Sequence, residues 1–348
     1  MEKVAGLDVG VKHSTLCVVA KEAQSTRVVS RARTATTPVA IGDWLISTGI
    51  SRVGLEAGGQ SSWLARELES RGLTVTVMES RRQRAFGAYS KVKTDERDAR
   101  LIGEALASGL HTKVHVRSVW SQEVRAMLGA RLQLKRQSHQ CRQFVRGQLR
   151  AVGIELARGS GRGWWAEARA AAVDRGGMLG TSLMAMLAAG EALREQIAVL
   201  DKEIRRVARQ DAACRRMMTA PGAGVLTSLA LRASLDDAER FERSAEVGPY
   251  LGLTPSRYQS GALDRRGGIT KQGDGLVRSY LYEAAVSLLE RQKRDCPLRR
   301  WGLANQHRLG KRRTRVAVAR KLAVLMHRLW RSGETFDWNR GKDVSTNQ

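Results

Sequence analysis

Cysteine is scarce in this sequence, and its spacing indicates neither a metal site nor a disulfide framework. The four cysteines are far apart, and none belongs to a CxxC pair, which is the spacing typical of zinc sites and redox motifs. We therefore expect a protein that folds in a reducing compartment without zinc or disulfide bonds. The cysteines are Cys17, Cys141, Cys214 and Cys296.

Long apolar runs are also missing. No stretch of apolar residues approaches the length of about 18 that indicates a membrane helix. The opening residues, MEKVAGLDVG, lack the basic region followed by an apolar run that marks a secretory signal. We expect a soluble cytoplasmic protein that has no membrane partner.

Acidic residues are few compared with basic ones. The 348 residues include 60 Lys and Arg but only 34 Asp and Glu, which gives a formal net charge of +26. Such an excess attracts polyanions. The basic residues are spread through periodic segments and are not gathered in a tail, and the chain is long enough for two or three domains. The composition therefore predicts a folded nucleic-acid-binding protein.

The first part of the chain alternates strand-like and helix-like segments. Three β-rich runs, VAGLDVG, STLCVVAKE and STRVVSRAR, are separated by polar breaks. A helical run at 41–46, the strand-like RVGLEA, a helix at 61–70, the strand-like LTVTVME and a helix from about Thr94 follow. This order predicts an α/β layer domain over residues 1–115.

Two long helices are expected over residues 116–210. The first runs from about Ser118 to Val152 and carries many basic residues, of which Arg131, Lys135, Arg142 and Arg146 are candidate nucleic-acid contacts. The second has apolar residues at alternating steps of four and three, typical of a coiled coil. That seam predicts either an intramolecular hairpin of the two helices or an oligomerisation arm. The seam residues are Met186, Gly190, Leu193, Ile197, Leu200, Ile204 and Val207.

Residues 211–332 are expected to form a mostly α-helical C-terminal domain, and 333–348 a loose tail. Pro221 and Gly222 separate two apolar periods between Met217 and Leu231, a pattern that indicates a helix-hairpin-helix-like element. Glycines in such a turn let backbone amides approach a phosphate, although a plain helix-helix turn has the same pattern.

Four carboxylates have a spacing that predicts a metal site. Asp8 and Glu56 each end an apolar run, where a strand would deliver them to the edge of a sheet. Asp95 and Asp98 are three residues apart and would share one face of a helix. Acids in a first helical turn can also simply complement the helix dipole. Four oxygen ligands without His or Cys suit Mg²⁺ or Mn²⁺, and four carboxylates could bind two such ions.

A serine within a basic, glycine-containing segment is the candidate nucleophile. Ser260 precedes Gly261, and an amphipathic helix with apolar residues at 276, 280, 284 and 288 follows. A serine beside glycine is often only a turn residue, and Ser256 is a nearby rival. The basic residues that could hold a phosphate here are Arg265, Arg266, Lys271 and Arg278.

Both sets of motifs resemble one family. GLDVG, LEAGG and KTDERDA, followed later by YLGLTP, SG, GGITKQGD and LVRSYLYEAA, look like the DEDD transposases of insertion-sequence family 110. In that family the N-terminal domain is similar to the RuvC Holliday-junction resolvase, which has an RNase-H-like fold. Departures are small: Gly10 and Thr270 stand where the family often has Ser. The resemblance implies that Asp8, Glu56, Asp95 and Asp98 are the metal-binding tetrad.

The resemblance also implies a mechanism and partners. The serine of the SG motif, Ser260 here, would become covalently joined to DNA phosphate, and a bridge RNA would select donor and target DNA by pairing. We expect a bacterial, nucleoid-associated transposase or site-specific recombinase, working as a dimer or tetramer with an active site composed from two domains. Two alternatives stay open: a RuvC-like endonuclease that uses water as the nucleophile, and a non-catalytic basic nucleic-acid-binding protein.

Overall fold

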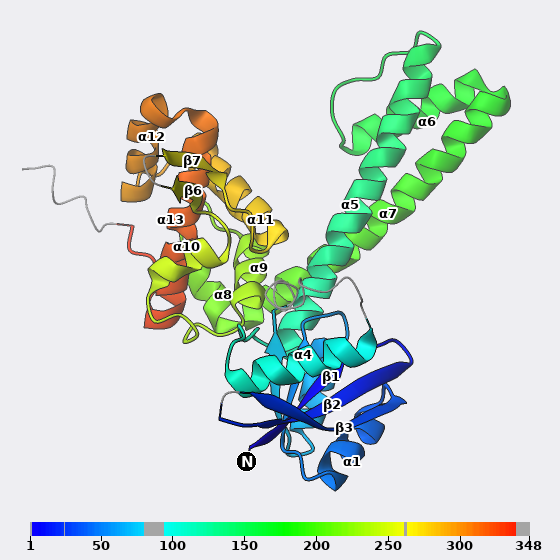
Figure 1. The fold of residues 1–348 in the computed structure, drawn as a ribbon. Coiled ribbons are helices and arrows are strands. Elements are labelled where there is room, and N and C mark those ends of the chain that lie inside the picture. Colours follow the sequence, from blue (N-terminus) through cyan, green and yellow to red (C-terminus); the bar gives the residue numbers. More distant parts are fainter. Residues whose placement is uncertain (1, 24, 80–93, 261–262, 339–348) are drawn as a thin grey trace, which may run out of the picture. The chain divides into compact units, whose positions relative to one another are not determined.

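The computed structural model describes residues 2–23, 25–79, 94–260 and 263–338. The chain forms two compact units, Met1–Arg117 and Ser118–Gln348 (Figure 1). Gly261 of the SG motif and Lys93 of the KTDERDA motif lie outside the described residues. Within the described part, no helix combines the length and the apolar character needed to cross a bilayer.

The first unit is built on a five-stranded sheet. Its strand order is β3-β2-β1-β4-β5, with β1, β2 and β3 antiparallel and with β4 and β5 parallel to β1. This mixed sheet, with helices in the connections, confirms the predicted RNase-H-like fold. The elements are β1 (Lys3–Asp8), β2 (His13–Lys21), β3 (Thr26–Ala35), α1 (Pro38–Ser47), β4 (Arg52–Glu56), α2 (Ser61–Glu69), β5 (Thr74–Met78) and α4 (Asp95–Ser108).

Helices cover both faces of this sheet. Leu7 and Leu55 point to one face and share a core with Leu64 of α2. On the other face, Cys17 and Met78 pack with the apolar side of α4, which crosses the sheet in Figure 1. Because successive side chains of a strand point to opposite faces, the buried strands β1 and β2 contribute to both cores.

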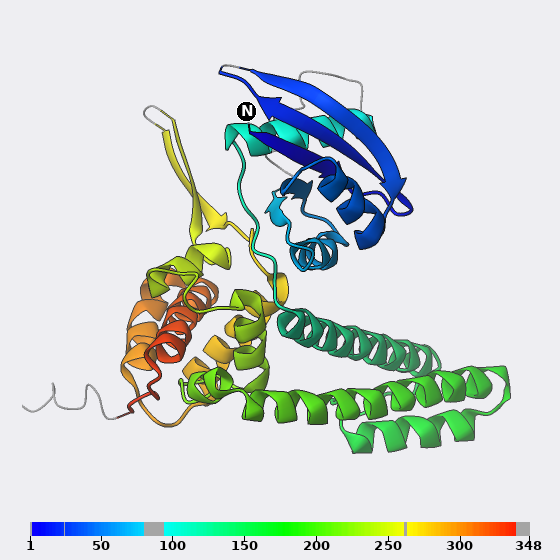
Figure 2. The ribbon, with the colours of Figure 1, turned by 90° about the horizontal axis from the view of Figure 1, so that it is seen from below.

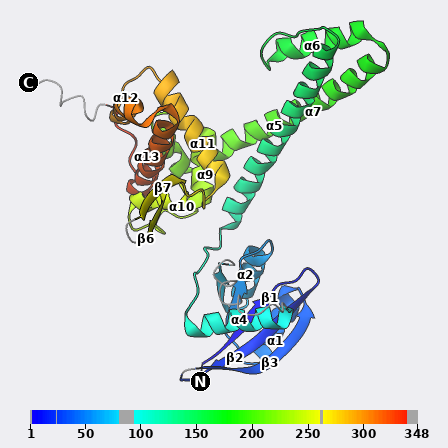
Figure 3. The ribbon, with the colours of Figure 1, turned by 45° about the horizontal axis from the view of Figure 1, so that its top comes forward.

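The second unit begins with a helical arm. Helices α5 (Val119–Ala151) and α7 (Gly177–Gln210) pack along each other, and α6 (Arg162–Arg175) packs against α7 (Figure 3). Ser118 is the N-cap of α5, since its side chain accepts a hydrogen bond from Ser121 N. The packing of α5 on α7 is the intramolecular hairpin, one of the two arrangements expected for these helices, and an oligomerisation arm stays a prediction.

The arm continues into a helical core. Val124 of α5 and Ile204 of α7 belong to the same apolar cluster as the C-terminal helices, while the division into domains at residue 210 stays a prediction. The mostly helical character expected here is confirmed. The elements are α8 (Ala212–Met217), α9 (Val225–Leu235), the 3-10 turn η1 (Ser244–Glu246), α10 (Val247–Tyr250), β6 (Pro255–Ser260), β7 (Leu263–Ile269), α11 (Gly275–Val286), the π-helical η2 (Ser287–Arg291), α12 (Pro297–Leu309) and α13 (Lys311–Ser332).

Two features of this unit differ from expectation. Phe336 and Trp338 pack against the core, and the Phe336 backbone amide donates a hydrogen bond to Thr219 Oγ1 at 2.8 Å. The prediction of a loose tail is therefore wrong for 333–338, while 339–348 lie outside the described residues. A two-stranded hairpin of β6 and β7 also interrupts the helices, and the sequence analysis did not predict it.

The packing of α4 on β1 yields a stability prediction. A Cβ atom at Gly6 would overlap the carbonyl oxygen of Ala99 and the amide nitrogen of Gly103. We expect Gly6→Ala to lower the free energy of unfolding of the first unit by about 3 kcal/mol, because two backbones would have to separate. Urea denaturation followed by circular dichroism measures this. Gly59→Ala, which meets nothing within 4 Å, should change it by less than about 0.5 kcal/mol. Equal effects would contradict the contact.

Candidate active site

Asp8 and Glu56 end two neighbouring parallel strands. The last pair in the β1–β4 register is Leu7 with Leu55, so Asp8 and Glu56 come next on strands that lie about 4.8 Å apart. Both residues are half-buried. The structure thus places two of the four predicted carboxylates together at one edge of the sheet.

These two carboxylates lie on the sheet face that α4 covers. Leu7 and Leu55 point into the core beneath α1 and α2, so the next residue of each strand points to the opposite face. Gly6 and Gly54, two residues earlier, contact α4: a Cβ at Gly54 would meet Ile102 Cγ2 at 3.3 Å. The alternation of the strands therefore directs Asp8 and Glu56 toward the α4 side.

The other two carboxylates belong to the first turn of α4. Thr94 is the N-cap, and its side chain accepts a hydrogen bond from Arg97 N at 3.3 Å. Asp98 is half-buried and directly precedes Ala99, whose carbonyl oxygen lies against Gly6. Asp95, one turn earlier along the helix, is exposed. Asp98 is therefore attached to the point where α4 touches β1, and Asp95 lies nearer to solvent.

The donor chemistry of this group suits a hard divalent cation, because every ligand is a carboxylate oxygen. In the described part of the chain, however, no three His, Cys, Asp or Glu side chains are grouped closely enough to hold a metal ion. The fold brings the elements that carry the four acids together, while their side chains do not form a three-ligand cluster. Binding a metal there would require rotation of these side chains.

Ser260 is the last residue of β6, at the end of an exposed hairpin. It pairs with Leu263 of β7, and all six residues of β6 are exposed. In Figure 2 the hairpin extends away from the helices of its unit. Isolated two-stranded hairpins are only marginally stable in water. A hairpin of this kind is suited to being covered by a binding partner.

The rival serine is engaged in the structure of the hairpin. Ser256 Oγ donates a hydrogen bond to the carbonyl oxygen of Gly268 at 3.1 Å. It also fills the space where a Cβ of Gly267 would lie. Ser256 therefore holds the two strands together, and Ser260 is the better placed of the two hydroxyls to meet a substrate.

One face of the hairpin combines the serine with an aromatic and a basic residue. Tyr258 is 65% exposed and pairs across the hairpin with Arg265, which is exposed as well. Tyr258 and Ser260 are two residues apart, so they share a face. Tyr258 was not among the residues expected from the sequence. Its position two residues before Ser260 was the pattern that could have indicated it.

The opposite face of the hairpin is held by an ion pair. Arg257 forms two hydrogen bonds with the carboxylate of Asp264, at 2.8 and 3.0 Å. The backbone of Arg266 pairs with that of Arg257, and the side chain of Arg266 lies outside the described part.

Two of the predicted nucleic-acid contacts have structural roles instead. Arg131 is only 8% exposed and forms an ion pair with Asp201 of α7, so it joins the two helices of the arm. The prediction that Arg131 binds nucleic acid is therefore wrong. The half-buried Arg278 donates hydrogen bonds to the carbonyl oxygens of Leu251 and Gly273, which ties its guanidinium to the protein.

The remaining basic candidates are more accessible. Lys135 and Lys271 are exposed. Arg142 is half-exposed and contacts His139 Nδ1 at 2.8 Å. Arg146, also half-exposed, donates to two carbonyl oxygens in the loop after α5. Two exposed lysines thus remain as the most available of these cations.

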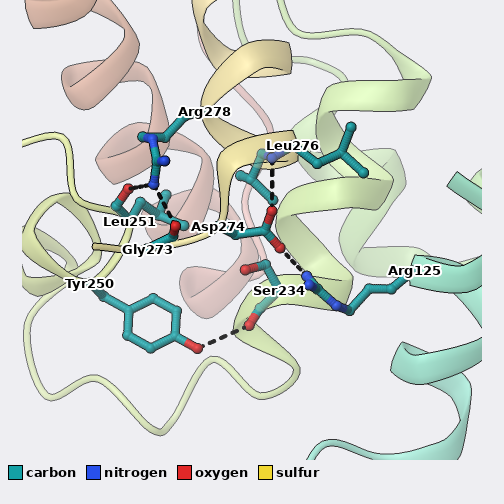
Figure 4. A network of polar contacts seen from close by, with 9 residues as sticks. Arg125, Ser234, Tyr250, Leu251, Gly273, Asp274, Leu276 and Arg278 are labelled. Atoms are coloured by element: carbon teal, nitrogen blue, oxygen red, sulfur yellow. Dashed lines mark hydrogen bonds and ion pairs between the residues drawn. The ribbon is translucent and has the colours of Figure 1, made fainter. Parts of the chain in front are cut away.

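A buried aspartate organises the motif that follows the hairpin (Figure 4). Asp274 caps α11 by accepting hydrogen bonds from Leu276 N at 2.9 Å and Val277 N at 3.3 Å. It also forms an ion pair with Arg125 of α5. Burial raises the pKa of Asp274, but the hydrogen bond and charge of Arg125 and the two amides outweigh it and hold the pKa below its usual value. The sequence analysis did not select Asp274.

Two glycines bring the loops before and after the hairpin together. Gly252 has a φ of +67°, and a Cβ there would lie 2.7 Å from Gln272 N. Gly273 leaves no room for a Cβ beside Tyr250 and Leu251. The YLGLTP and KQGD segments therefore pack backbone against backbone at the base of the hairpin, which explains why both motifs contain glycine.

Comparison with known families and proteins gives consistent matches. Residues 5–154 match the DEDD-type IS110 transposase family, and residues 214–297 match the transposase IS116/IS110/IS902 family. A transposase for insertion sequence element IS1111A from Coxiella burnetii is 27% identical over 345 residues, which are 96% of this chain and 91% of the relative. A probable family 20 transposase from Pseudomonas aeruginosa is 30% identical over 249 residues, 68% of this chain and 71% of the relative.

A solved structure also matches the chain. The Thermus thermophilus RuvC structure is 16% identical, with a TM-score of 0.26, and the match covers 32% of this chain and 100% of that chain.

The capping aspartate yields a pH-dependent prediction. Asp274→Asn keeps a capping side chain but leaves Arg125 without its charge partner, so we expect a loss of about 1–2 kcal/mol of unfolding free energy at pH 7. Since the folded pKa of Asp274 is lowered, its contribution is complete above the ordinary pKa of about 4 and is lost as the pH falls through the folded value. Urea denaturation at pH 7 and pH 3 measures the difference.

The matched control is Asp295→Asn, which breaks the exposed ion pair with Arg300 and should cost less than about 0.5 kcal/mol. A difference between Asp274→Asn and the wild type that stays constant between pH 7 and pH 3 would show that charge plays no part.

Proposed function

This chain belongs to the IS116/IS110/IS902 family of transposases, and we propose that it cuts and rejoins DNA by a serine mechanism assisted by divalent metal ions. Ser260 is the nucleophile in this proposal. The metal ions, Mg²⁺ or Mn²⁺, would be held by Asp8, Glu56, Asp95 and Asp98. DNA strand cleavage and transfer is the activity of the family, while the nucleophile, the identity of the metal and the guide are the proposed parts.

The observation that carries the proposal is the position of Ser260. It ends an exposed strand, and the other serine of that strand is occupied with the carbonyl oxygen of Gly268. The exposed Arg265 on the same hairpin supplies a positive charge for a phosphate. A nucleophile needs access to its substrate, and Ser260 has it.

The serine reaction conserves the energy of the phosphodiester. Ser260 Oγ attacks phosphorus, the bond from phosphorus to one DNA oxygen breaks, the serine proton passes to water, and the departing oxygen takes up a proton. The hydroxyl of a second strand then attacks the phosphoserine ester and releases Ser260, so rejoining needs no ATP. A serine hydroxyl is a weak nucleophile at neutral pH, and the bound divalent ions would favour its alkoxide and neutralise charge at the phosphate.

The proposed partners are donor DNA, target DNA and a bridge RNA. Support comes from the net charge of +26 and from the exposed basic residues Lys135 and Arg136 on α5, because polyanions of either kind bind such surfaces. We also propose a homodimer or homotetramer. Its support is the apolar surface that α7 leaves accessible: Ile197 and Leu200 are only partly buried, and Val199, on another side of the helix, is 60% exposed.

The test is a covalent protein-DNA adduct. We expect the wild-type protein, incubated with Mg²⁺, guide RNA and end-labelled DNA, to retain label after SDS electrophoresis. Ser260→Ala should abolish both the adduct and cleavage, because it removes the hydroxyl that forms the ester in this proposal. Ser256→Ala is the matched control and should retain both, although it loses a hydrogen bond within the hairpin.

Two outcomes would contradict the proposal. Wild-type protein that cleaves DNA with no adduct at any time would indicate water as the nucleophile, the reaction of a structure-selective endonuclease. An adduct formed by Ser260→Ala would assign the nucleophile to another residue.

A further inference from the structure

A groove in the second unit runs along α13. Its volume is about 1660 Å³. One end is formed by the base of the serine hairpin, at Pro255 and at Gly267 to Ile269, and its lining extends to Phe336. Partly buried apolar side chains, Leu298, Trp301, Val316 and Leu325, form much of its wall.

The groove is rich in cations that have no acidic partner. Five basic residues of α13 line it, and among the described residues none of the five forms an ion pair with a carboxylate. Elsewhere on the same helix, Arg315 pairs with Glu290 and Arg331 with Glu239. The unpaired cations therefore gather on the side of α13 that faces the groove. They are Arg312, Arg313, Arg320, Lys321 and Arg328.

The spacing of these cations suits an extended ligand. Arg312, Arg320 and Arg328 follow one another at intervals of eight residues, which is about 12 Å of rise along a helix. Lys321 Nζ lies 4.4 Å from the centroid of the Trp301 ring. The wall of the groove therefore has a positive charge directly beside an aromatic surface. Glu334 and Asp337, beyond the end of α13, are the acidic residues of the lining.

Size and chemistry together select the ligand class. Small-molecule pockets occupy about 300–1,000 Å³, so this groove is large for a metabolite. Cations combined with apolar walls match a strand that presents phosphates and unstacked bases, whereas a duplex keeps its bases stacked inside. We propose that the groove binds single-stranded DNA beside the serine hairpin. The choice of DNA rests on the proposed function, because Ser260 lies at the tip of the hairpin whose base forms this end of the groove.

Other occupants match the groove less well. Residues 339–348, NRGKDVSTNQ, contain two basic residues and one acidic residue, so their charge has the same sign as the groove. A second copy of this chain would bring a net charge of +26. Single-stranded DNA supplies the opposite charge and apolar faces at once.

The experiment measures binding without catalysis. Fluorescence anisotropy in EDTA is recorded for full-length protein with a labelled 20-nucleotide single strand of DNA, the same sequence as RNA, and the DNA duplex, across salt concentrations. We expect Arg312→Gln/Arg320→Gln/Arg328→Gln to weaken single-stranded DNA binding about tenfold or more. The slope of log affinity against log salt should fall by about 2, since each phosphate contact on a single strand contributes about 0.7.

The matched control removes the same charge outside the groove. Arg243→Gln/Arg300→Gln/Arg308→Gln changes three exposed arginines of the same unit and should leave the slope unchanged. Circular dichroism and thermal melting check that both triple variants fold. Because no cleavage is measured, failure of the serine assay would leave this result intact.

Several outcomes would overturn the proposal. These are equal losses in the two triple variants, unchanged binding of single-stranded DNA, or a loss confined to RNA or duplex. Deletion of 339–348 that raises the affinity of the wild type but not of the groove variant would assign the groove to that segment. A smaller mass by light scattering in the groove variant, with DNA binding unchanged, would assign it to a second copy.

Discussion

Close packing of backbone against backbone at glycine positions the candidate catalytic elements in both units. In the first unit, Gly6 lets α4 touch β1, and this contact lies one residue from Asp98 and two from Asp8. In the second, Gly252 and Gly273 join the loops on either side of the β6–β7 hairpin that carries Ser260. A side chain at any of these sites would force the two adjoining backbones apart. The glycines in the motifs around the candidate residues therefore serve mainly to let two backbone segments come close together.

Charge has two distinct roles in the second unit. Partly buried acids hold the framework: Asp274 joins α5 to the cap of α11, and Asp201 joins α7 to Arg131 of α5. Pairs of this kind neutralise part of the basic excess inside the protein. Among the described residues, five cations of α13 that form no ion pair with a carboxylate lie along one groove. The positions of the cations that have no carboxylate partner therefore say more about where a polyanion would bind than the net charge of +26 does.

Elements whose apolar residues follow a clear pattern could be predicted from the sequence. Elements without such a pattern were missed. Strands ending at Asp8 and Glu56 were predicted because their buried residues alternate clearly with polar breaks. The β6–β7 hairpin was missed because β6 is exposed on both faces, so no apolar alternation marks it. Arg131 was assigned to the surface because its partner, Asp201, lies 70 residues away in the sequence. Its position three residues after the buried Leu128 was a local sign of the packed side.

The proposed reaction needs both the carboxylates and Ser260. It is tested most directly by the serine-DNA adduct in Asp8→Asn/Glu56→Gln, which keeps the size of both side chains and leaves Ser260 intact. With Mg²⁺ and guide RNA, we expect this variant to fold and bind DNA as the wild type does, yet to form no adduct, because the serine lacks its metal-assisted activation. An adduct formed at the wild-type rate would show that Ser260 works without these carboxylates and would contradict the claim.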